Sequence, residues 1–282
     1  MNRKYIYPIV IIIVTVALYY ADDLFPKDTN SVENSSKTVQ RNSEEFDDSF
    51  LPASTTGAIV QHNFFTLSYS EKDEQAEWVA YELKRKDLSK NEYKRPYFIE
   101  DKNVKTQSAD WRNYKNSGYD RGHLCPAGDR TMTFEAYNET FLTSNISPQD
   151  RDFNSGIWNR LEQKVRFWAE KHDGVYIVTG GVLKGNMKTI GEENVSVPNE
   201  FYKIIVDVTD GNYKAIAFVI PNKPSSESFY EYAVSIDEIE AKTGIDFFPK
   251  LPDSIENEME QMAIFLNWDG FMNDGNSPHP IL

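Results

Sequence analysis

Two apolar runs joined by four turn residues constrain the fold of this chain more than any other feature. The runs are Phe201–Val208 and Tyr213–Ile220, and the sequence between them is Thr209-Asp210-Gly211-Asn212. Both runs are rich in β-branched and aromatic residues, and an Asp-Gly turn favours a tight antiparallel hairpin. Glu77–Leu83 and Gly174–Val182 have the same composition. The sequence therefore predicts a sheet that is largely antiparallel.

Helical segments are interspersed with these strands. The clearest is Asn154–Lys171, in which four apolar residues recur at helical spacing on one face: Ile157, Leu161, Val165 and Trp168. A second helix is predicted over Ser235–Thr243, because Ser235 and Glu238 form a capping box and Gly244 follows as a stop signal. Strands and helices mix without regular alternation, which predicts an α+β fold with a central, largely antiparallel sheet flanked by helices.

The N-terminal segment, residues 1–21, has a separate character. Arg3 and Lys4 precede an apolar run from Tyr5 to Tyr20, the pattern of a secretory signal peptide or of a short membrane anchor. The run is at the short end of the roughly 17–25 residues that span a bilayer. Both interpretations predict an exported protein, periplasmic or extracellular, and an uncleaved anchor adds a membrane contact. A buried N-terminal helix is the third alternative.

Residues 22–55 are rich in Ser, Asn, Asp and Glu, with almost no apolar periodicity. Such a segment buries too little apolar surface to fold by itself, so it is predicted to be a disordered linker. The pattern becomes globular at about Thr56, which predicts a single folded domain over residues 56–282. The chain has a single cysteine, Cys125, so no intramolecular disulfide can form. The stability of the domain must therefore come from its hydrophobic core.

Charge is distributed unevenly along the chain. The net charge of −14 argues against a protein that passively coats nucleic acid, because phosphates would be repelled. Between Lys84 and Arg130, however, twelve Lys and Arg residues face seven Asp and Glu residues. One interpretation is a basic working face for a polyanion on an acidic body. The other is an ordinary solvated surface of mixed charge.

The residues best suited to chemistry begin with Asp120-Arg121-Gly122-His123. Histidine is the side chain that can take a proton from water near neutral pH, and arginine matches the oxygens of a phosphate. Alone, a histidine beside an arginine is a weak signal, because such pairs are also common in purely structural settings.

A second group of polar residues follows within forty residues of the first. It comprises Asn145, in Thr143–Gln149, and then Asn154 and Glu162. The amide oxygen of Asn154 suits a hard cation. On one helix, Asn154 and Glu162 would lie about 12 Å apart along the axis, so Glu162 would hold the waters of the ion and not the ion itself. The ordinary alternatives are a helix N-cap for Asn154 and a surface position for Glu162.

Together these motifs resemble one family. DRGH (120–123), SNISPQ (144–149) and FNSGIWNRLE (153–162) are similar to the DNA/RNA non-specific endonucleases. These are the ββα-metal (His-Me finger) nucleases, which include mitochondrial endonuclease G. The similarity runs from about Thr56 to the C-terminus and includes Val197–Asp207 and Val234–Asp253. The resemblance implies the ββα-metal nuclease fold and a metal-dependent endonuclease that hydrolyses DNA and RNA without sequence specificity.

The resemblance also implies roles for individual residues. His123 would be the general base that deprotonates the attacking water. Asn154 would be the direct ligand of a divalent metal, Mg²⁺ or alternatively Mn²⁺, and Glu162 would anchor the waters of that metal. The products would carry a 5′-phosphate and a 3′-hydroxyl.

Three further residues receive supporting roles from the same resemblance. Arg121 would contact the phosphate or stabilise developing charge, and Arg95, in the segment KRPYFIED, would be a second phosphate contact. Asn145 would help to order the site. These roles agree with the general chemistry of in-line attack on phosphorus, which needs a base, a Lewis acid and cations at the non-bridging oxygens.

Some alternatives remain open from the sequence. Cys125 stands where the family commonly has alanine, so a Cys–His nucleophile pair is one of them. The others are a phosphodiesterase for a small or lipid substrate and an inactive module that binds nucleic acid or protein. His62, His172 and His279 are predicted at the surface, and Trp158 and Trp168 in the core. The sequence leaves open the preference between DNA and RNA, and whether the chain forms a homodimer.

Overall fold

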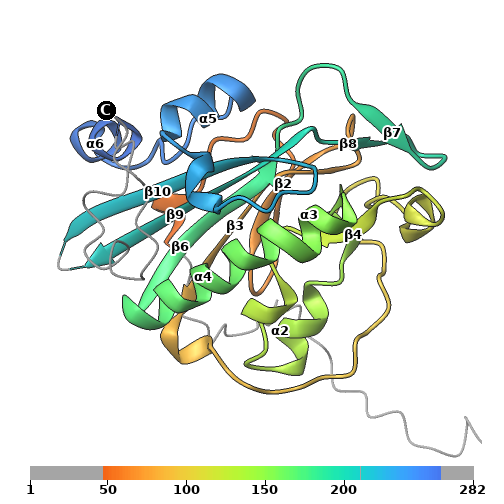
Figure 1. Ribbon diagram of the computed structural model, residues 1–282, viewed down its shortest axis with the longest axis horizontal. Coiled ribbons are helices and arrows are strands. Elements are labelled where there is room, and N and C mark those ends of the chain that lie inside the picture. The colour runs from red at the N-terminus through yellow and green to blue at the C-terminus, as the bar shows by residue number, and fades with distance from the viewer. Residues whose placement is uncertain (1–46, 210, 262–282) are drawn as a thin grey trace, which may run out of the picture. The chain divides into compact units, whose positions relative to one another are not determined.

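The computed structural model describes residues 47–209 and 211–261 (Figure 1). The predicted signal peptide or anchor over residues 1–21, residues 22–46 of the predicted linker, and His279 lie outside the described residues. None of the helices in the described part of the chain has the length and apolar character needed to cross a bilayer.

The central element is a seven-stranded sheet in the order β1-β2-β3-β6-β9-β10-β11. Every neighbouring pair in it is antiparallel, so the prediction of a largely antiparallel sheet is confirmed. Its strands are β1 (Ile59–Gln61), β2 (Thr66–Ser70), β3 (Gln75–Lys84), β6 (Gly174–Gly181), β9 (Glu200–Thr209), β10 (Asn212–Pro221) and β11 (Ala233–Val234). The predicted hairpin is β9–β10, which pairs from Thr209↔Asn212 to Glu200↔Pro221.

The two faces of the sheet are both covered, as the alternation of side chains along β9 shows. Phe201 and Ile205 pack into one core cluster with helix α4 (Asn159–Lys171), which lies across β3 and β6 (Figure 1). Ile204 and Val206 pack into the opposite cluster with α5 (Ile236–Thr243) and α6 (Asp253–Gln261). Each fully buried apolar side chain of this kind stabilises the fold by roughly 1.5–3 kcal/mol.

Helix α5 begins and ends as its sequence predicts. The side chain of Ser235 accepts a hydrogen bond from the backbone N–H of Glu238 at 3.1 Å. Gly244 closes the helix in the left-handed conformation at φ 71°, which glycine adopts without steric cost.

The helix predicted over Asn154–Lys171 is interrupted near its start. Asp150 caps a short first turn, α3 (Arg151–Phe153), and a wide turn η6 (Asn154–Trp158) follows before α4 begins. Gly156 sits in this turn with φ −99° and ψ −108°, outside the helical region. The prediction of one continuous helix is therefore wrong in its first turns. Gly156 allows the backbone to leave helical geometry there, because glycine has no Cβ to restrict it.

The described body begins before the predicted boundary at Thr56. The short 3₁₀ helix η1 (Asp48–Phe50) places Phe50 in the core, where it is 2% exposed and its ring stacks on Tyr176 at 3.9 Å between centroids. The indole of Trp78 donates a hydrogen bond to the carbonyl of Ala53 at 3.0 Å. The last residues of the polar segment predicted as a linker thus contribute an aromatic side chain to the fold.

Outside the large sheet, two small ribbons and several short helices complete the described body. One ribbon is β4 (Asp120–His123) with β5 (Ile146–Gln149), and the other is β7 (Lys188–Ile190) with β8 (Val195–Val197). The short helices are η2 (Arg85–Asp87), η3 (Trp111–Tyr114), η4 (Ala127–Asp129), α2 (Phe134–Glu139), η5 (Thr143–Asn145) and η7 (Phe229–Tyr232). Because β4 and β5 lead into α3, η6 and α4, the chain forms a strand–strand–helix unit at the motifs.

Candidate active site

The β4–β5 ribbon brings the two sequence motifs together. Its register pairs His123 with Ile146 and Gly122 with Ser147. Gly122 has no room for a side chain, because an added Cβ would lie 2.1 Å from the Cδ atom of Gln149, which is itself fully buried. The glycine of DRGH therefore permits the close packing that places His123 at the end of β4.

His123 lies between two aromatic rings. The ring centroids of Phe98 and Phe141 are 5.6 Å and 5.0 Å from that of the imidazole. Its Nε2 atom is buried, neither ring nitrogen has a hydrogen-bond partner among the described residues, and the side chain retains some exposure at Nδ1. Burial and the positive charge of Arg95 lower the pKa of His123 to about 3. The imidazole is therefore uncharged at neutral pH and can accept a proton.

Two arginines flank the same aromatic ring. The guanidinium carbons of Arg95 and Arg121 lie 5.3 Å and 4.8 Å from the centroid of Phe98. Among the described residues, neither guanidinium has a carboxylate partner, whereas the other arginines of this part of the chain are ion-paired or hydrogen-bonded. Two unneutralised cations held at one place form a site for an anion, and a phosphodiester is an anion whose geometry arginine matches.

Asn154 is oriented by a carboxylate of the DRGH strand. Its Nδ2 donates a hydrogen bond to Oδ2 of Asp120 at 3.2 Å, and Arg151 holds the other oxygen of Asp120 with Nε at 3.5 Å. Asp150, and not Asn154, caps the helix. Because the amide nitrogen is committed to Asp120, the amide oxygen of Asn154 is left free among the described residues, on a half-exposed side chain.

This donor set fits a divalent cation with an oxygen preference. The amide oxygen of Asn154 and the neighbouring carboxylate of Asp120 are both hard ligands, of the kind that Mg²⁺ and Mn²⁺ prefer over nitrogen or sulfur. The amide oxygen of Asn154 accepts no hydrogen bond among the described residues, and its amide nitrogen ties the side chain to the strand that carries His123.

Glu162 lies on α4 in a charged cluster of its own. Burial raises the pKa of Glu162 to about 7, opposed by the positive charge of Lys203 and reinforced by the negative charge of Asp129. At neutral pH this carboxyl group is therefore poised between its charged and uncharged forms, and a nearby cation shifts it toward the carboxylate.

Sequence reasoning missed the partners of Glu162. Arg166 donates to Asp129 at 2.6 Å, and the hydroxyl of Tyr81 donates to the same carboxylate at 2.9 Å. Lys203 is buried in β9, and its Nζ has no hydrogen-bond partner in the described part of the chain, 4.8 Å from the ring centroid of Trp158. Two signals pointed to them: Arg166 stands four residues after Glu162, and Lys203 interrupts an apolar strand.

Asn145 is fully buried, and its side chain bonds the backbone next to His123. Its side-chain oxygen accepts from the backbone N–H of Cys125 at 2.8 Å, and its Nδ2 donates to the carbonyls of Cys125 and Thr140, each at 2.9 Å. Cys125 follows His123 by two residues, so these bonds fix the chain where it leaves β4. Asn145 therefore holds the backbone in place just beyond His123.

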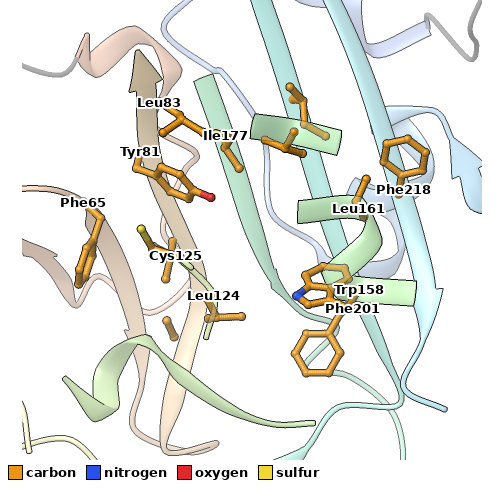
Figure 2. Packing of buried hydrophobic residues seen from close by; sticks show 14 of the residues in the cluster. Phe65, Tyr81, Leu83, Leu124, Cys125, Trp158, Leu161, Ile177, Phe201 and Phe218 are labelled. Atoms are coloured by element: carbon orange, nitrogen blue, oxygen red, sulfur yellow. The ribbon is translucent and has the colours of Figure 1, made fainter. Parts of the chain in front are cut away.

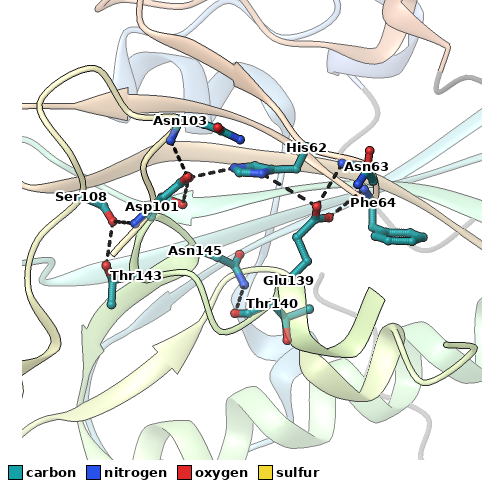
Figure 3. Close-up of polar contacts among 11 residues, drawn as sticks. His62, Asn63, Phe64, Asp101, Asn103, Ser108, Glu139, Thr140, Thr143 and Asn145 are labelled. Atoms are coloured by element: carbon teal, nitrogen blue, oxygen red, sulfur yellow. Dashed lines mark hydrogen bonds and ion pairs between the residues drawn. The ribbon is translucent and has the colours of Figure 1, made fainter. Parts of the chain in front are cut away.

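The surface position predicted for His62 is wrong. The side chain is buried at 8% exposure, and Figure 3 shows it between Asp101 and Glu139. Its Nε2 lies 2.8 Å from Oδ2 of Asp101, which also accepts from the hydroxyl of Ser144 at 2.6 Å. The network anchors the turn before β5. The partners of His62 are distant in sequence, so a local sequence pattern could not predict this network.

The thiol of Cys125 does not support a Cys–His nucleophile. The side chain is fully buried among Phe65, Tyr81 and Leu124 (Figure 2). Burial raises the pKa of Cys125 to about 12, so the nucleophilic thiolate is absent at neutral pH. Trp158 and Trp168 lie in the same core cluster, as predicted.

The six predicted residues therefore occupy four places in the structure. His123, Arg95 and Arg121 gather around Phe98. Asn154 is tied to the same strand through Asp120. Glu162 lies near the charges of Lys203 and Asp129. Asn145 bonds the backbone of Cys125, where the chain leaves β4.

Comparison with known proteins identifies a family whose sequences match this chain. The DNA/RNA non-specific endonuclease family matches residues 42–254. Nuclease EXOG, mitochondrial, of Homo sapiens is 36% identical over 203 residues, which cover 66% of this chain and 55% of that protein. A nuclease of Nostoc sp. is 34% identical over 217 residues, covering 72% of this chain and 77% of that protein.

Two further matches extend the comparison. Endonuclease G, mitochondrial, of Caenorhabditis elegans is 34% identical over 216 residues, which cover 69% of each protein. A crystal structure of the EndoG/EndoGI complex matches with a TM-score of 0.66 and 28% identity, covering 70% of this chain and 88% of that one. The chain spans 55–62% of the length of the vertebrate EXOG nucleases that it matches.

These relatives correct one prediction. The EXOG nucleases and the endonuclease G of Caenorhabditis elegans are mitochondrial by name, which contradicts an exported or membrane-anchored protein. The physical reason is that two cations before a short apolar run describe a hydropathy pattern and do not specify a destination. Residues 1–21, on which the prediction rested, lie outside the described residues.

The family match covers most of the chain, and two relatives at 34% identity, the Nostoc nuclease and the endonuclease G of Caenorhabditis elegans, align along more than two thirds of their own length. The α+β architecture with its antiparallel sheet and strand–strand–helix unit agrees with the EndoG structure. The chain is therefore a member of the DNA/RNA non-specific endonuclease family, the ββα-metal nucleases.

Proposed function

We propose that this protein is a metal-dependent endonuclease that hydrolyses phosphodiester bonds in DNA and RNA without sequence specificity. One observation carries the proposal: an uncharged His123 with an accessible Nδ1 lies beside two guanidiniums that have no carboxylate partner in the described residues. A base and a pair of free cations around one ring are what attack of water on a phosphodiester requires.

His123 acts as the general base in this proposal. Nδ1 takes a proton from a water molecule as its oxygen attacks phosphorus. The negative phosphodiester at Arg95 and Arg121 favours the protonated imidazole, so substrate binding raises the pKa of His123 from its low resting value. The two arginines neutralise the charge that gathers on the non-bridging oxygens. Because they contact phosphate and not base edges, they give no sequence preference.

Asn154 would hold the divalent metal, Mg²⁺ or Mn²⁺, through its amide oxygen, with Asp120 fixing the orientation of that amide. A bound metal supplies Lewis-acid stabilisation of the leaving 3′-oxygen. Glu162, in its carboxylate form, orders water on that side of the site. Attack opposite the 3′-oxygen leaves a 3′-hydroxyl on one product and a 5′-phosphate on the other.

The direct test uses the full chain with supercoiled plasmid and with single-stranded RNA, each in Mg²⁺, in Mn²⁺ and in EDTA. We expect cleavage of both substrates in either metal and none in EDTA. The products should be joined by a ligase that requires a 5′-phosphate and a 3′-hydroxyl. Binding without cleavage in every metal would indicate an inactive binding module and would overturn the proposal.

Glu162, and not His123, is expected to set the acid limb of activity. With a pKa of about 7, the Glu162 carboxyl loses its charge as the pH falls below neutrality, whereas His123 stays uncharged until far lower pH. We expect kcat/KM of the wild-type protein to fall below about pH 7 with a slope of one proton. Glu162→Gln should remove this limb and lower the plateau.

Two variations identify the group responsible. Raising the Mg²⁺ concentration should move the limb to lower pH, because a cation favours the carboxylate. Lys203→Met should move it to higher pH, because the charge that opposes the rise in the pKa of Glu162 is removed. A limb that persists unchanged in Glu162→Gln would assign it to another group.

A further inference from the structure

Among the exposed aromatic side chains of the described residues, Trp111 lies next to Arg121, one of the two cations without a carboxylate partner there. We propose that Trp111 stacks on an unpaired base of the strand whose phosphate lies at Arg121, so that single-stranded segments are the favoured substrate. This inference rests on the proposed function and adds to it a binding subsite and a substrate class.

Trp111 differs from the other tryptophans of the described residues. Its side chain opens the short helix η3 and is 37% exposed, whereas Trp78, Trp158 and Trp168 are at most 1% exposed. Isolated exposed apolar residues are ordinary on protein surfaces, so exposure alone identifies no site. The neighbours of Trp111 provide the second observation.

Two guanidiniums lie against the indole of Trp111. The guanidinium carbons of Arg112 and Arg121 are 5.6 Å and 6.0 Å from its ring. Arg112 is ion-paired with Asp110, so its charge is already offset. The charge of Arg121 has no carboxylate partner within the described ranges. A free guanidinium beside an exposed aromatic face is the combination that holds single strands, in which the cation takes the backbone and the ring takes a base.

Arg121 also links Trp111 to the catalytic cluster. It lies 4.8 Å from the ring of Phe98, which is 5.6 Å from the ring of His123. A nucleotide whose phosphate lies at Arg121 therefore has its base within reach of the indole while an adjoining phosphodiester faces His123. Trp111 would bind the nucleotide next to the bond that is cut.

The platform is held in place before any ligand binds. The backbone N–H of Asp110 donates to Glu193 at 2.8 Å, and the side chain of Asn113 donates to the carbonyl of Asp110 at 2.8 Å and to Glu193. Asp110 in turn caps η3 through the N–H of Arg112 at 2.7 Å. Because the segment is fixed, little ordering opposes stacking.

The stacking mode determines the substrate class. Every base has an aromatic face, so stacking carries no sequence preference and agrees with a non-specific enzyme. In a duplex both faces of each base are already covered by neighbouring bases. Trp111 can therefore act on single strands, loops and ends, but not inside an intact helix.

The test compares Trp111→Ala, Trp111→Phe and the control Phe167→Ala on one oligonucleotide, offered as a single strand and as a duplex. Phe167 is a matched control because it is 43% exposed and lies beside a cation, with Lys164 4.4 Å from its ring. We expect Trp111→Ala to lower kcat/KM for the single strand roughly fivefold to a hundredfold and for the duplex less than about twofold. Trp111→Phe should retain most of the activity, and Phe167→Ala all of it.

A second readout measures binding without cleavage. In EDTA, addition of single-stranded oligothymidine should quench tryptophan fluorescence of the wild-type protein, and that quenching should be lost in Trp111→Phe. Equal losses of activity on single strand and duplex, or quenching that is unchanged in Trp111→Phe, would overturn the inference. If the wild-type protein cleaves neither substrate, the proposed function fails, while the quenching experiment still decides the stacking site.

Discussion

His123→Ala is expected to lower kcat by roughly 10²- to 10⁴-fold on DNA and on RNA alike, the range that loss of a general base produces. The substitution breaks no side-chain hydrogen bond, because neither ring nitrogen has a partner among the described residues. It removes the ring contacts with Phe98 and Phe141, which contribute about 1 kcal/mol. The melting temperature should therefore fall by only a few degrees.

Single-turnover cleavage with saturating Mg²⁺ measures this loss directly, and calorimetry measures stability on the same samples. His172→Gln is the matched control, since His172 is a half-buried histidine beside Asp207 at 3.2 Å, at the C-terminal end of α4. The control should keep wild-type kcat. Cleavage that survives in His123→Ala would show that another group takes the proton.

Asn154→Ala should be the second variant that nearly abolishes activity. The amide oxygen that we assign to the metal is lost, and Asp120 loses the N–H that it accepts at 3.2 Å. Loss of one oxygen donor is expected to lower kcat by about 10²-fold or more and to raise the Mg²⁺ concentration needed for half-maximal activity. Titration of activity with Mg²⁺ separates these two effects.

Two comparisons sharpen this experiment. Asn154→Asp keeps an oxygen ligand for the metal but has no N–H to give to Asp120. Compared with Asn154→Ala, it should therefore recover part of the activity at high Mg²⁺. Asn138→Ala, on α2, changes a half-buried asparagine outside the ribbon and should leave the Mg²⁺ requirement unchanged. An unchanged requirement in Asn154→Ala would place the metal elsewhere.

Much of the fold could be read from local patterns. The β9–β10 hairpin and the caps of α5 follow from short stretches in which turn chemistry, side-chain alternation and capping residues agree. The antiparallel sheet follows from the same strands. Of the site, the positions of Asn145, Asn154 and His123 around one ribbon follow from motifs that are close in sequence.

The remainder depends on contacts between distant segments, which a sequence pattern does not report. His62 finds Asp101 across 39 residues, and Phe50 finds Tyr176 from a polar segment. Lys203 reads as one interruption in a strand until the fold places its charge close enough to act on Glu162. Gly156 can be seen in the sequence, but whether a glycine interrupts a helix depends on the tertiary packing of the next turn.

The β4–β5 ribbon, in which the motifs meet, pairs two segments that are close in sequence. His123 pairs with Ile146 after a short excursion of chain, whereas in the large sheet Val79 pairs with Thr179. Closing a longer loop costs more entropy, so the ribbon can form without waiting for the sheet. His123 and the chain that leads to Asn154 thus form a compact segment of local contacts, which can reach its geometry before the large sheet closes.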